Sequence, residues 1–382
     1  MRLRRVRLGP VFVIFLSMIA EAASGLGRSV DWSVATEGAL QQASLGVTPH
    51  IIFVYITDRL SPAADRIRAL IRRRTGANIV TGTIGVGVCG VGDEAMDEPA
   101  VSILALRLTD ASLAREVIWD KDDGREFLAE NTSFRGLVAQ MHTHSSMVPR
   151  LLSREDDTKH WLCGGLTSSR GPQAQFSTHK ILENGATGVI FSRETPIQVG
   201  LAQGCVPLGP MRRVTAVVGS VVLTIDNRAA LDVLEQDIAS LNITEPREIG
   251  RQVCIGVTLP HRDKHDYLVR NLTGLGGADR AIAVGHQFRL GDTFQFVTRD
   301  ADSARVEMRQ MLESLASRMP KPAAGVYVSC VARGGGLFGE PDVEPSLIQE
   351  VFGDIPLVGF FSGGEIYNRE LYAHSGVLTL LG

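Results

Sequence analysis

Two glycine-rich stretches near the C-terminal end hold the residue types best suited to binding a small ligand. They are VYVSCVARGGGLFGEPD, which begins at Val326, and GFFSGGEI, which begins at Gly359. Backbone N–H groups with little steric cover can hold a carboxylate or a phosphate, and an acid such as Glu365 complements a positive group. Together they suit a zwitterion. The alternative is a pair of tight turns with Glu365 in a surface ion pair, and the residues alone leave both interpretations open.

The candidate ligand site is assigned to these two stretches, because each follows an apolar strand and they flank one predicted helix. We expect the cysteine at the end of the first strand to line or underlie the site. The glycine loop would form one side and the second stretch the other. The predicted ligand-binding residues are Cys330, Gly334, Gly335, Gly336, Gly339, Glu340, Ser362, Gly363, Gly364 and Glu365. No catalytic residue is assigned, since Ser362 lacks a plausible local base and a serine at a strand end more often forms a turn.

A histidine pair offers a different chemistry. His142 and His144 lie in MHTHSS at the end of a predicted strand, where alternate side chains point to one side and both imidazoles could meet one metal ion. Acidic residues and His160 follow, and one of them could supply the third ligand that a catalytic zinc needs. The pattern fits no named metal motif, and a polar loop also explains it. We expect no metal and no cofactor, with a metal-dependent enzyme using this pair as the alternative.

Other motifs for cofactor binding or catalysis are not supported. GVGVCG, at positions 85–90, matches G-x-G-x-x-G by letter, but a dinucleotide site needs a helix directly after the glycines. Here Pro99 and a strand follow. The sequence contains no G-x-S-x-G elbow and no P-loop.

The composition is that of a folded globular protein and excludes some partners. The 382 residues are enough for two domains, and hydrophobic and charged residues make up 44% and 21%. A net charge of −3 argues against nucleic acid, which would require a basic face. The five cysteines are scattered without a C-x-x-C pair, which indicates buried thiols rather than a zinc site or disulfide framework.

The elements that must position these residues follow an α/β pattern. HIIFVYI, at positions 50–56, is an apolar run rich in β-branched residues and predicts a buried strand. A helix follows, with Ile67, Leu70 and Ile71 on one face and Gly76 at its end, and then a second strand near 78–83. The strands between 186 and 205 are joined by links too short for crossover helices, so they are antiparallel. We therefore predict mixed sheets with strand-helix-strand units and antiparallel hairpins in the middle.

Three similar stretches suggest internal repetition. A buried strand ends in small residues in TGTIGVGVCGVGDE, in WLCGGLTSS and in VGFFSGGEI. The first and third also follow a strand-helix unit and keep an acid just past the glycines. The predicted α/β fold therefore has two related lobes.

The sequence resembles the FIST family of sensory proteins. The resemblance is most specific in SCVARGGGLFGEPD and in PLVGFFSGGEIYNRELYAHSGVLTLL. It extends back through YLVRNLTGLGGADRAIAVGHQFRLGDTFQFVTRDADSA and, more weakly, to WLCGGLTSS and the segment from HIIFVYI to GVGVCGVGDE. It implies an N-terminal extension or signal-like segment at 1–28, a FIST N-terminal-type domain at 29–226 and a FIST C-terminal-type domain at 227–382.

The resemblance implies a function in sensing. Family members are thought to bind small ligands, with amino acids proposed, and to act in signal transduction. We expect a non-enzymatic sensory protein that binds a small molecule such as an amino acid, with a signalling partner that the sequence does not identify. A protein-interaction adaptor, like the F-box relatives, is a further alternative.

The N-terminal residues leave two expectations for location. MRLRRVRLG is basic, PVFVIFLSMIA is apolar and small residues follow near Ala22, as in a signal peptide. The apolar run is much shorter than the ~20 residues of a spanning helix, so no transmembrane anchor is expected. The resemblance begins near Asp31-Trp32, and cleavage near Ala22 could remove part of the first strand. A cytoplasmic location is therefore favoured, with export as the alternative.

Overall fold

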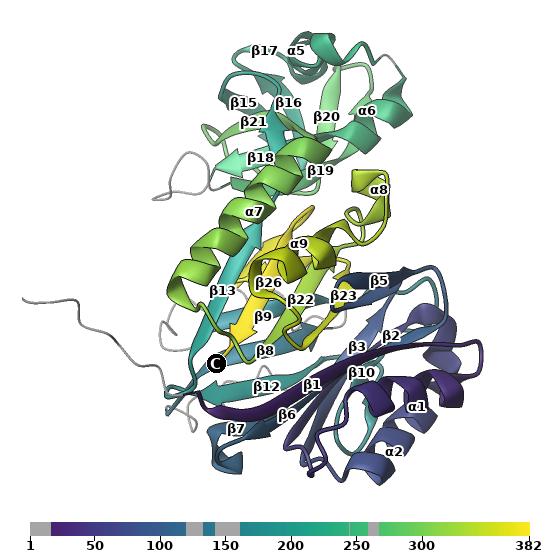
Figure 1. The fold of residues 1–382 in the computed structure, drawn as a ribbon. Coiled ribbons are helices and arrows are strands. Elements are labelled where there is room, and N and C mark those ends of the chain that lie inside the picture. The colour runs from purple at the N-terminus through teal and green to yellow at the C-terminus, as the bar shows by residue number, and fades with distance from the viewer. Residues whose placement is uncertain (1–16, 120–132, 142–160, 244, 259–266) are drawn as a thin grey trace, which may run out of the picture.

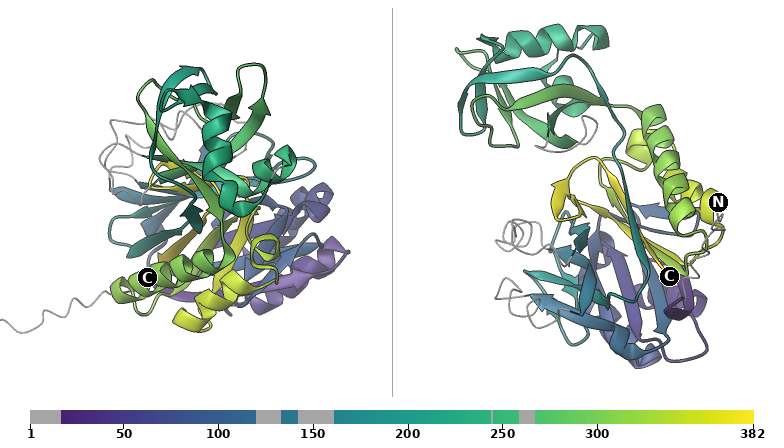
Figure 2. Two further views of the ribbon diagram at one scale, coloured as in Figure 1. Left: turned by 90° about the horizontal axis from the view of Figure 1, so that it is seen from above. Right: turned by 90° about the vertical axis from the view of Figure 1, so that its left-hand side faces the viewer.

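The computed structural model describes residues 17–119, 133–141, 161–243, 245–258 and 267–382. Within these residues the chain forms three six-stranded sheets and a separate barrel. The barrel lies at one end of the molecule and the three sheets at the other (Figures 1 and 2). The mixed α/β fold predicted from the sequence is confirmed.

The three sheets have the following strand orders. The first is β1 (Ile19–Arg28), β6 (Ala100–Leu108), β2 (Ile51–Thr57), β3 (Ile79–Gly85), β10 (Gln175–Phe176) and β11 (Ile181–Leu182). The second is β7 (Ala114–Trp119), β12 (Ala186–Ser192), β8 (Phe134–Met141), β9 (Trp161–Leu166), β24 (Glu365–Tyr367) and β25 (Glu370–Tyr372). The third is β13 (Ile197–Ala202), β26 (Gly376–Leu381), β22 (Ala324–Cys330), β23 (Leu357–Ser362), β4 (Gly87–Gly90) and β5 (Asp93–Met96).

All three sheets share one topology. The central pair is parallel in each sheet, namely β2/β3, β8/β9 and β22/β23, and every other neighbouring pair in these sheets is antiparallel. The relation between lobes predicted from the sequence therefore extends to a third unit. The three glycine-containing stretches that look alike in the sequence are β3, β9 and β23, at the same place in each sheet.

The three units exchange hairpins in a cycle. The hairpin β4–β5 follows β3 along the chain but adds to β23, and β24–β25 follows β23 but adds to β9. The hairpin β10–β11 follows β9 but adds to β3, which closes the cycle. Each sheet is thus completed by a segment distant in sequence, and the three units form one body.

A glycine in the second parallel strand of each sheet makes this packing possible. Gly82, Gly164 and Gly359 are register partners of residues in the neighbouring parallel strand. A Cβ atom at these glycines would lie 1.6, 1.8 and 2.2 Å from the carbonyl oxygens of Val54, Ala139 and Tyr327. Gly82 and Gly164 also have φ angles of 155° and 136°, which L side chains rarely adopt.

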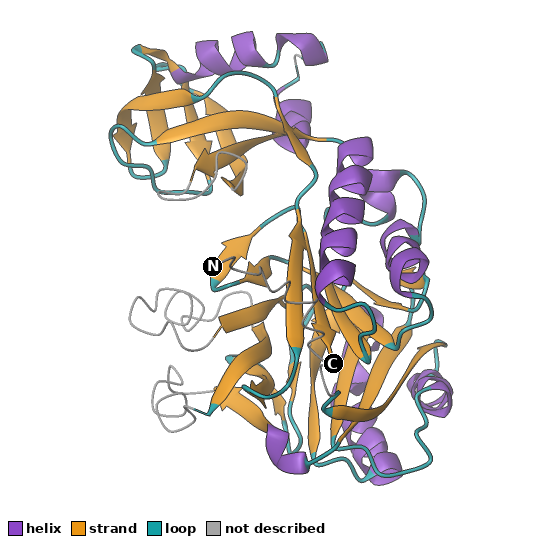
Figure 3. Ribbon diagram, turned by 60° about the vertical axis from the view of Figure 1, so that its left-hand side comes forward, coloured by secondary structure: helices purple, strands orange, loops and turns teal. Residues whose placement is uncertain are grey.

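One apolar core joins the inner faces of the three sheets. It contains Phe53 of β2, Val138 of β8 and Val326 of β22, together with Phe360 and Phe191 from neighbouring strands. Helices cover outer faces (Figure 3): α1 (Trp32–Gln42) and α2 (Ala64–Thr75) pack on the first sheet, and α7 (Ala301–Arg318) and α9 (Val343–Phe352) pack on the third. The shorter helical segments are η1 (Asp58–Ala63), η2 (Ala111–Leu113), η3 (Ala239–Leu241) and α8 (Gly335–Phe338).

The barrel closes through pairing of β18 with β21. Its strands follow the order β21 (Thr293–Arg299), β15 (Arg212–Val218), β16 (Val221–Ile225), β20 (Ala281–Val284), β19 (Tyr267–Gly276) and β18 (Val253–Thr258). The remaining elements here are β14 (Cys205–Pro207), β17 (Arg228–Ala229), α5 (Ala230–Asp237) and α6 (Pro246–Gln252). The barrel is inserted between β13 and β22 of the third unit, and its strands come from both sides of the 226/227 sequence boundary.

The strand predicted at 50–56 is observed one residue later, as β2 (Ile51–Thr57). The predicted helix end at Gly76 is observed, with Gly76 in the left-handed conformation. In the described parts of the chain, no helix has both the length and the apolar character needed to cross a membrane.

Candidate functional site

The structure brings two of the predicted site residues together at the ends of neighbouring strands. Cys330 ends β22, and its register partner Ser362 ends β23. Glu365 begins β24, three residues later, and is completely buried. Burial raises the pKa of the Cys330 thiol, and the Glu365 charge raises it further, which shows that the two groups interact.

Glu365 is an unusual buried acid because only half of its carboxylate is satisfied. Its Oε2 accepts hydrogen bonds from the Ser375 N–H at 3.2 Å and the Ser375 hydroxyl at 2.9 Å. Its Oε1 has no hydrogen-bond partner among the described residues. Burial raises the pKa of Glu365 from 4.5 to about 8, and the Ser375 bonds, the Arg333 charge and a hydrogen bond from the Cys330 side chain oppose this rise only in part. The carboxyl group is thus mainly protonated at neutral pH.

The internal repetition shows that the fold does not require an acid here. Glu365 is the register partner of Gly165, one residue after the close-packed Gly164. In the other two sheets, Gln175 and Val88 occupy the corresponding position, opposite the residues that follow Gly82 and Gly359. An amide and an apolar side chain therefore stand where the third sheet-completing hairpin has a carboxylic acid.

A buried ion pair that the sequence reasoning missed lies beside Glu365. Arg333 Nε donates to Glu344 Oε1 at 2.7 Å, and both side chains are completely buried. Tyr327 and Ser329 donate to the two oxygens of Glu344, each at 2.6 Å. Burial lowers the pKa of Arg333, but the charge of Glu344 outweighs this effect, so the guanidinium stays charged. One feature of the sequence could have pointed to this ion pair. Arg333 is a single charged residue between a buried strand and a run of glycines.

Arg333 and Glu365 both contact the segment that precedes β26. Arg333 Nη1 donates to the carbonyl oxygens of Gln203 and, at 3.3 Å, of His374, while Glu365 accepts from Ser375. Arg333 Nη2 has no hydrogen-bond partner within the described parts of the chain, and the guanidinium lies over the Phe338 ring, 5.5 Å from its centroid. Arg333 and Glu365 thus each keep one atom without a hydrogen bond, and both contact the consecutive residues His374 and Ser375.

His374 completes this group of buried polar residues. Its Nε2 lies 2.7 Å from Asn271 Oδ1 of the barrel, and its Nδ1 has no partner in the described structure. Burial, together with the charges of Arg299 and Arg333, lowers the pKa of His374 from 6.5 to about 4. The imidazole is therefore neutral at physiological pH. We call Cys330, Arg333, Glu365, His374 and Ser375 the buried polar site.

The glycine loop lies against an acidic side chain of the protein itself, Glu94 on the exchanged hairpin β4–β5. Burial, followed by the charges of Glu344 and Asp342, raises the pKa of Glu94 to about 7. The nearby Gly335 backbone N–H lowers the pKa of Glu94, but only slightly. Gly334 has a φ of 55°, and a Cβ there would lie 2.9 Å from the Phe361 ring and 3.3 Å from Glu94 Oε1. Glu94 therefore occupies the space next to these two glycines.

The other predicted residues lie outside the buried polar site. Gly336, Gly339 and Glu340 are exposed, and Glu340 forms an ion pair with Arg305 of α7 at 2.9 Å. The Ser362 hydroxyl lies 2.6 Å from the Gly364 carbonyl oxygen and 3.0 Å from that of Leu166, and it accepts from the Gly364 N–H. The Gly363 N–H donates to Leu166, so this turn packs on the end of β9. This stretch forms a tight turn, as the alternative interpretation proposed, while Glu365 next to it is buried rather than on the surface.

The alternative histidine site cannot be located, because His142 and His144 lie outside the described residues. Within the described ranges, no group of three or more histidine, cysteine or acidic side chains could hold a metal ion. All five cysteines are buried and none forms a disulfide, as expected from their spacing.

Comparisons with known proteins place the chain in a family. It is 32% identical over 214 residues to the uncharacterized proteins Rv0628c of Mycobacterium tuberculosis (strain H37Rv) and Mb0898c of Mycobacterium bovis. The matches cover 53% of this chain, and 55% and 54% of those proteins, so the chain spans about half the length of these relatives. The profile of the FIST N domain matches residues 50–228, and that of the FIST C domain matches residues 230–368. The chain therefore belongs to the FIST family.

Proposed function

We propose that this protein is a non-enzymatic sensor that binds a small zwitterion, such as an amino acid, at the buried polar site. FIST domains are associated with small-ligand sensing and signalling. The observation that carries the proposal is the pair of unsatisfied groups, Arg333 Nη2 and Glu365 Oε1, because buried polar atoms in native proteins nearly always have partners. A ligand that satisfies both would remove this cost.

The charges of the site match an α-amino acid. The ligand carboxylate would accept from Arg333 Nη2, and the ligand ammonium group would donate to Glu365 Oε1. The His374–Ser375 segment, which contacts both groups, would have to move to admit the ligand. Such a movement would displace β19 of the barrel or break its hydrogen bond to His374, since His374 Nε2 bonds Asn271 of that strand. This is a physical route by which binding could reach a signalling partner.

The pH dependence of binding follows from Glu365. The ammonium group needs the carboxylate form, whereas the raised pKa keeps Glu365 protonated below about pH 8. Affinity should therefore increase by up to about tenfold per pH unit between pH 6 and 8 and level off above, because the ionised fraction follows the titration. A ligand that binds through neutral groups alone would show no such increase.

Thermal-shift screening of the full chain against the twenty amino acids tests the proposal. The expected result is a stabilising ligand whose affinity falls at least about tenfold in Glu365→Gln, which keeps the side-chain shape and removes the charge. Arg333→Lys should also weaken binding, since it keeps the charge but loses donors. Glu340→Gln is the matched control, because Glu340 is an exposed acid of the glycine loop. The proposal fails if no amino acid stabilises the protein, or if Glu340→Gln weakens binding while Glu365→Gln does not.

A further inference from the structure

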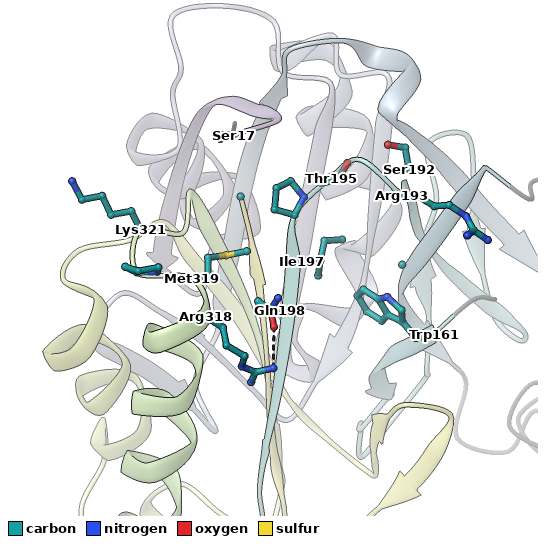
Figure 4. A pocket seen from close by; sticks show the side chains of 14 residues that line it. Ser17, Trp161, Ser192, Arg193, Thr195, Ile197, Gln198, Arg318, Met319 and Lys321 are labelled. Carbon is teal, nitrogen blue, oxygen red and sulfur yellow. Dashed lines mark hydrogen bonds between the residues drawn. The ribbon is translucent and has the colours of Figure 1, made fainter. Parts of the chain in front are cut away.

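A second site lies at the other end of the strands. A cavity of about 670 Å³ is bounded by the beginnings of β9 and β13, the end of α7 and the turn after β12. Figure 4 shows Arg318 and Lys321 on one wall and Trp161 and Arg193 on the opposite wall, with Ile197 and Gln198 between them. Its volume lies within the range of pockets that bind small molecules.

The cavity is positively charged. Arg193, Arg318 and Lys321 line it, and no acidic side chain of the described residues does. The Arg318 guanidinium is held in place, because its Nη1 donates to Gln198 Oε1 at 2.9 Å and its Nε to the Ser314 carbonyl oxygen at 3.3 Å. Arg318 and Lys321 therefore place two positive charges on one wall of the cavity.

A flat aromatic surface faces these cations. The indole of Trp161 packs directly on Gly136 of β8, where a Cβ atom would lie only 2.6 Å from Trp161 Cζ2 and 3.1 Å from Ile197 Cδ1. Any larger residue at Gly136 would collide with the indole.

An unsatisfied polar group lies in the same lining. The Thr195 side chain is 6% exposed, and its hydroxyl has no partner in the described part of the chain. Because the Thr195 oxygen itself is covered, a small local shift would bring this unpaired hydroxyl to a ligand oxygen.

We infer that this cavity binds an organic anion with a flat aromatic part. The acidic group of the ligand would lie near Arg318 and Lys321, and its ring would stack against Trp161. Thr195 would bond a ligand oxygen. This site is independent of the buried polar site, which lies at the ends of β22 and β23 and lacks an aromatic wall of this kind among its defining residues. An aromatic carboxylate and an aromatic phosphate share the required chemistry.

Titration with 8-anilinonaphthalene-1-sulfonate, a fluorescent aromatic anion, tests this inference on the folded full chain. One saturable site is expected, with affinity about tenfold lower in each of Arg318→Ala and Lys321→Ala, because each removes one charge. Trp161→Leu should weaken binding and lower the fluorescence of the bound dye. Arg309→Ala is the control, since Arg309 lies on the same helix but pairs with Glu350 at 2.6 Å, outside the cavity.

Neutral and competing compounds complete the test. N-phenyl-1-naphthylamine has the same rings without the charge and should bind much more weakly. Displacement of the dye by 1-naphthoate or by 1-naphthyl phosphate distinguishes a carboxylate ligand from a phosphate ligand. Equal binding of the neutral compound, or unchanged affinity in both Arg318→Ala and Lys321→Ala, would overturn the inference. Glu365→Gln should leave dye binding unchanged, because Glu365 does not line this cavity. The dye titration and the amino-acid screen therefore test the two proposed sites independently.

Discussion

Glu365 should make the folded protein less stable as the pH rises, and Glu365→Gln should remove this effect. In an unfolded chain the carboxyl group ionises near pH 4.5, whereas in the folded protein burial raises its pKa to about 8. Between these values the unfolded chain has lost the proton and the folded protein retains it. Stability that is fully present below pH 4.5 is therefore lost progressively up to about pH 8.

The size of the effect follows from the same difference. A pKa raised from 4.5 to about 8 corresponds to roughly 5 kcal/mol, of which roughly 3 kcal/mol is already lost at pH 7. Glutamine resembles the protonated acid in shape and hydrogen bonding but cannot ionise. Glu365→Gln should thus equal the parent protein at pH 4.5 and exceed it by several kcal/mol at pH 8.

Urea denaturation at several pH values between 4.5 and 8 measures this difference directly. Glu94 also has a raised pKa, but it is present in both proteins, so its contribution cancels when the two curves are subtracted. Glu350→Gln serves as a control, because its side chain is 56% exposed and its ion pair contributes little. A difference between Glu365→Gln and the parent protein that stays constant with pH would refute the assigned burial of Glu365.

Two further predictions concern stability. Arg333→Met should cost about 3–5 kcal/mol in urea denaturation, because it leaves Glu344 charged and buried, and adding Glu344→Gln should recover part of the loss; no recovery would show that the lost packing, not the charge, matters. Gly164→Ala should greatly lower Tm or prevent folding, since the new Cβ would lie 1.8 Å from a carbonyl oxygen at a φ of 136°, while Gly171→Ala, with open space around it, should be tolerated. Equal Tm values for these two variants would contradict the proposed strand packing.

The candidate site shows how far a local pattern can lead. The two glycine stretches and Glu365 could be selected from the sequence because backbone donors and an acid near strand ends are local features. The partners of these residues could not be selected from the sequence. Gly335 lies near Glu94 and Arg333 bonds the Gln203 carbonyl oxygen, and each of these pairs is far apart along the chain. Which residues of a loop face inward depends on these distant contacts, so Gly336, Gly339 and Glu340 were indistinguishable from Gly334 until the fold was known.

The sequence by itself determined the local elements of this protein: the apolar strands, the amphipathic helix ended by Gly76, and the three similar strand ends. These depend on residue spacing over a few positions, which propensity and burial control directly. Only the tertiary structure decided that the three ends belong to three sheets of one topology, that each sheet takes a hairpin from another unit, and that Glu365 is buried. Strand pairing between remote segments depends on the packing of the whole core, and the pKa of Glu365 depends on the water which that packing excludes.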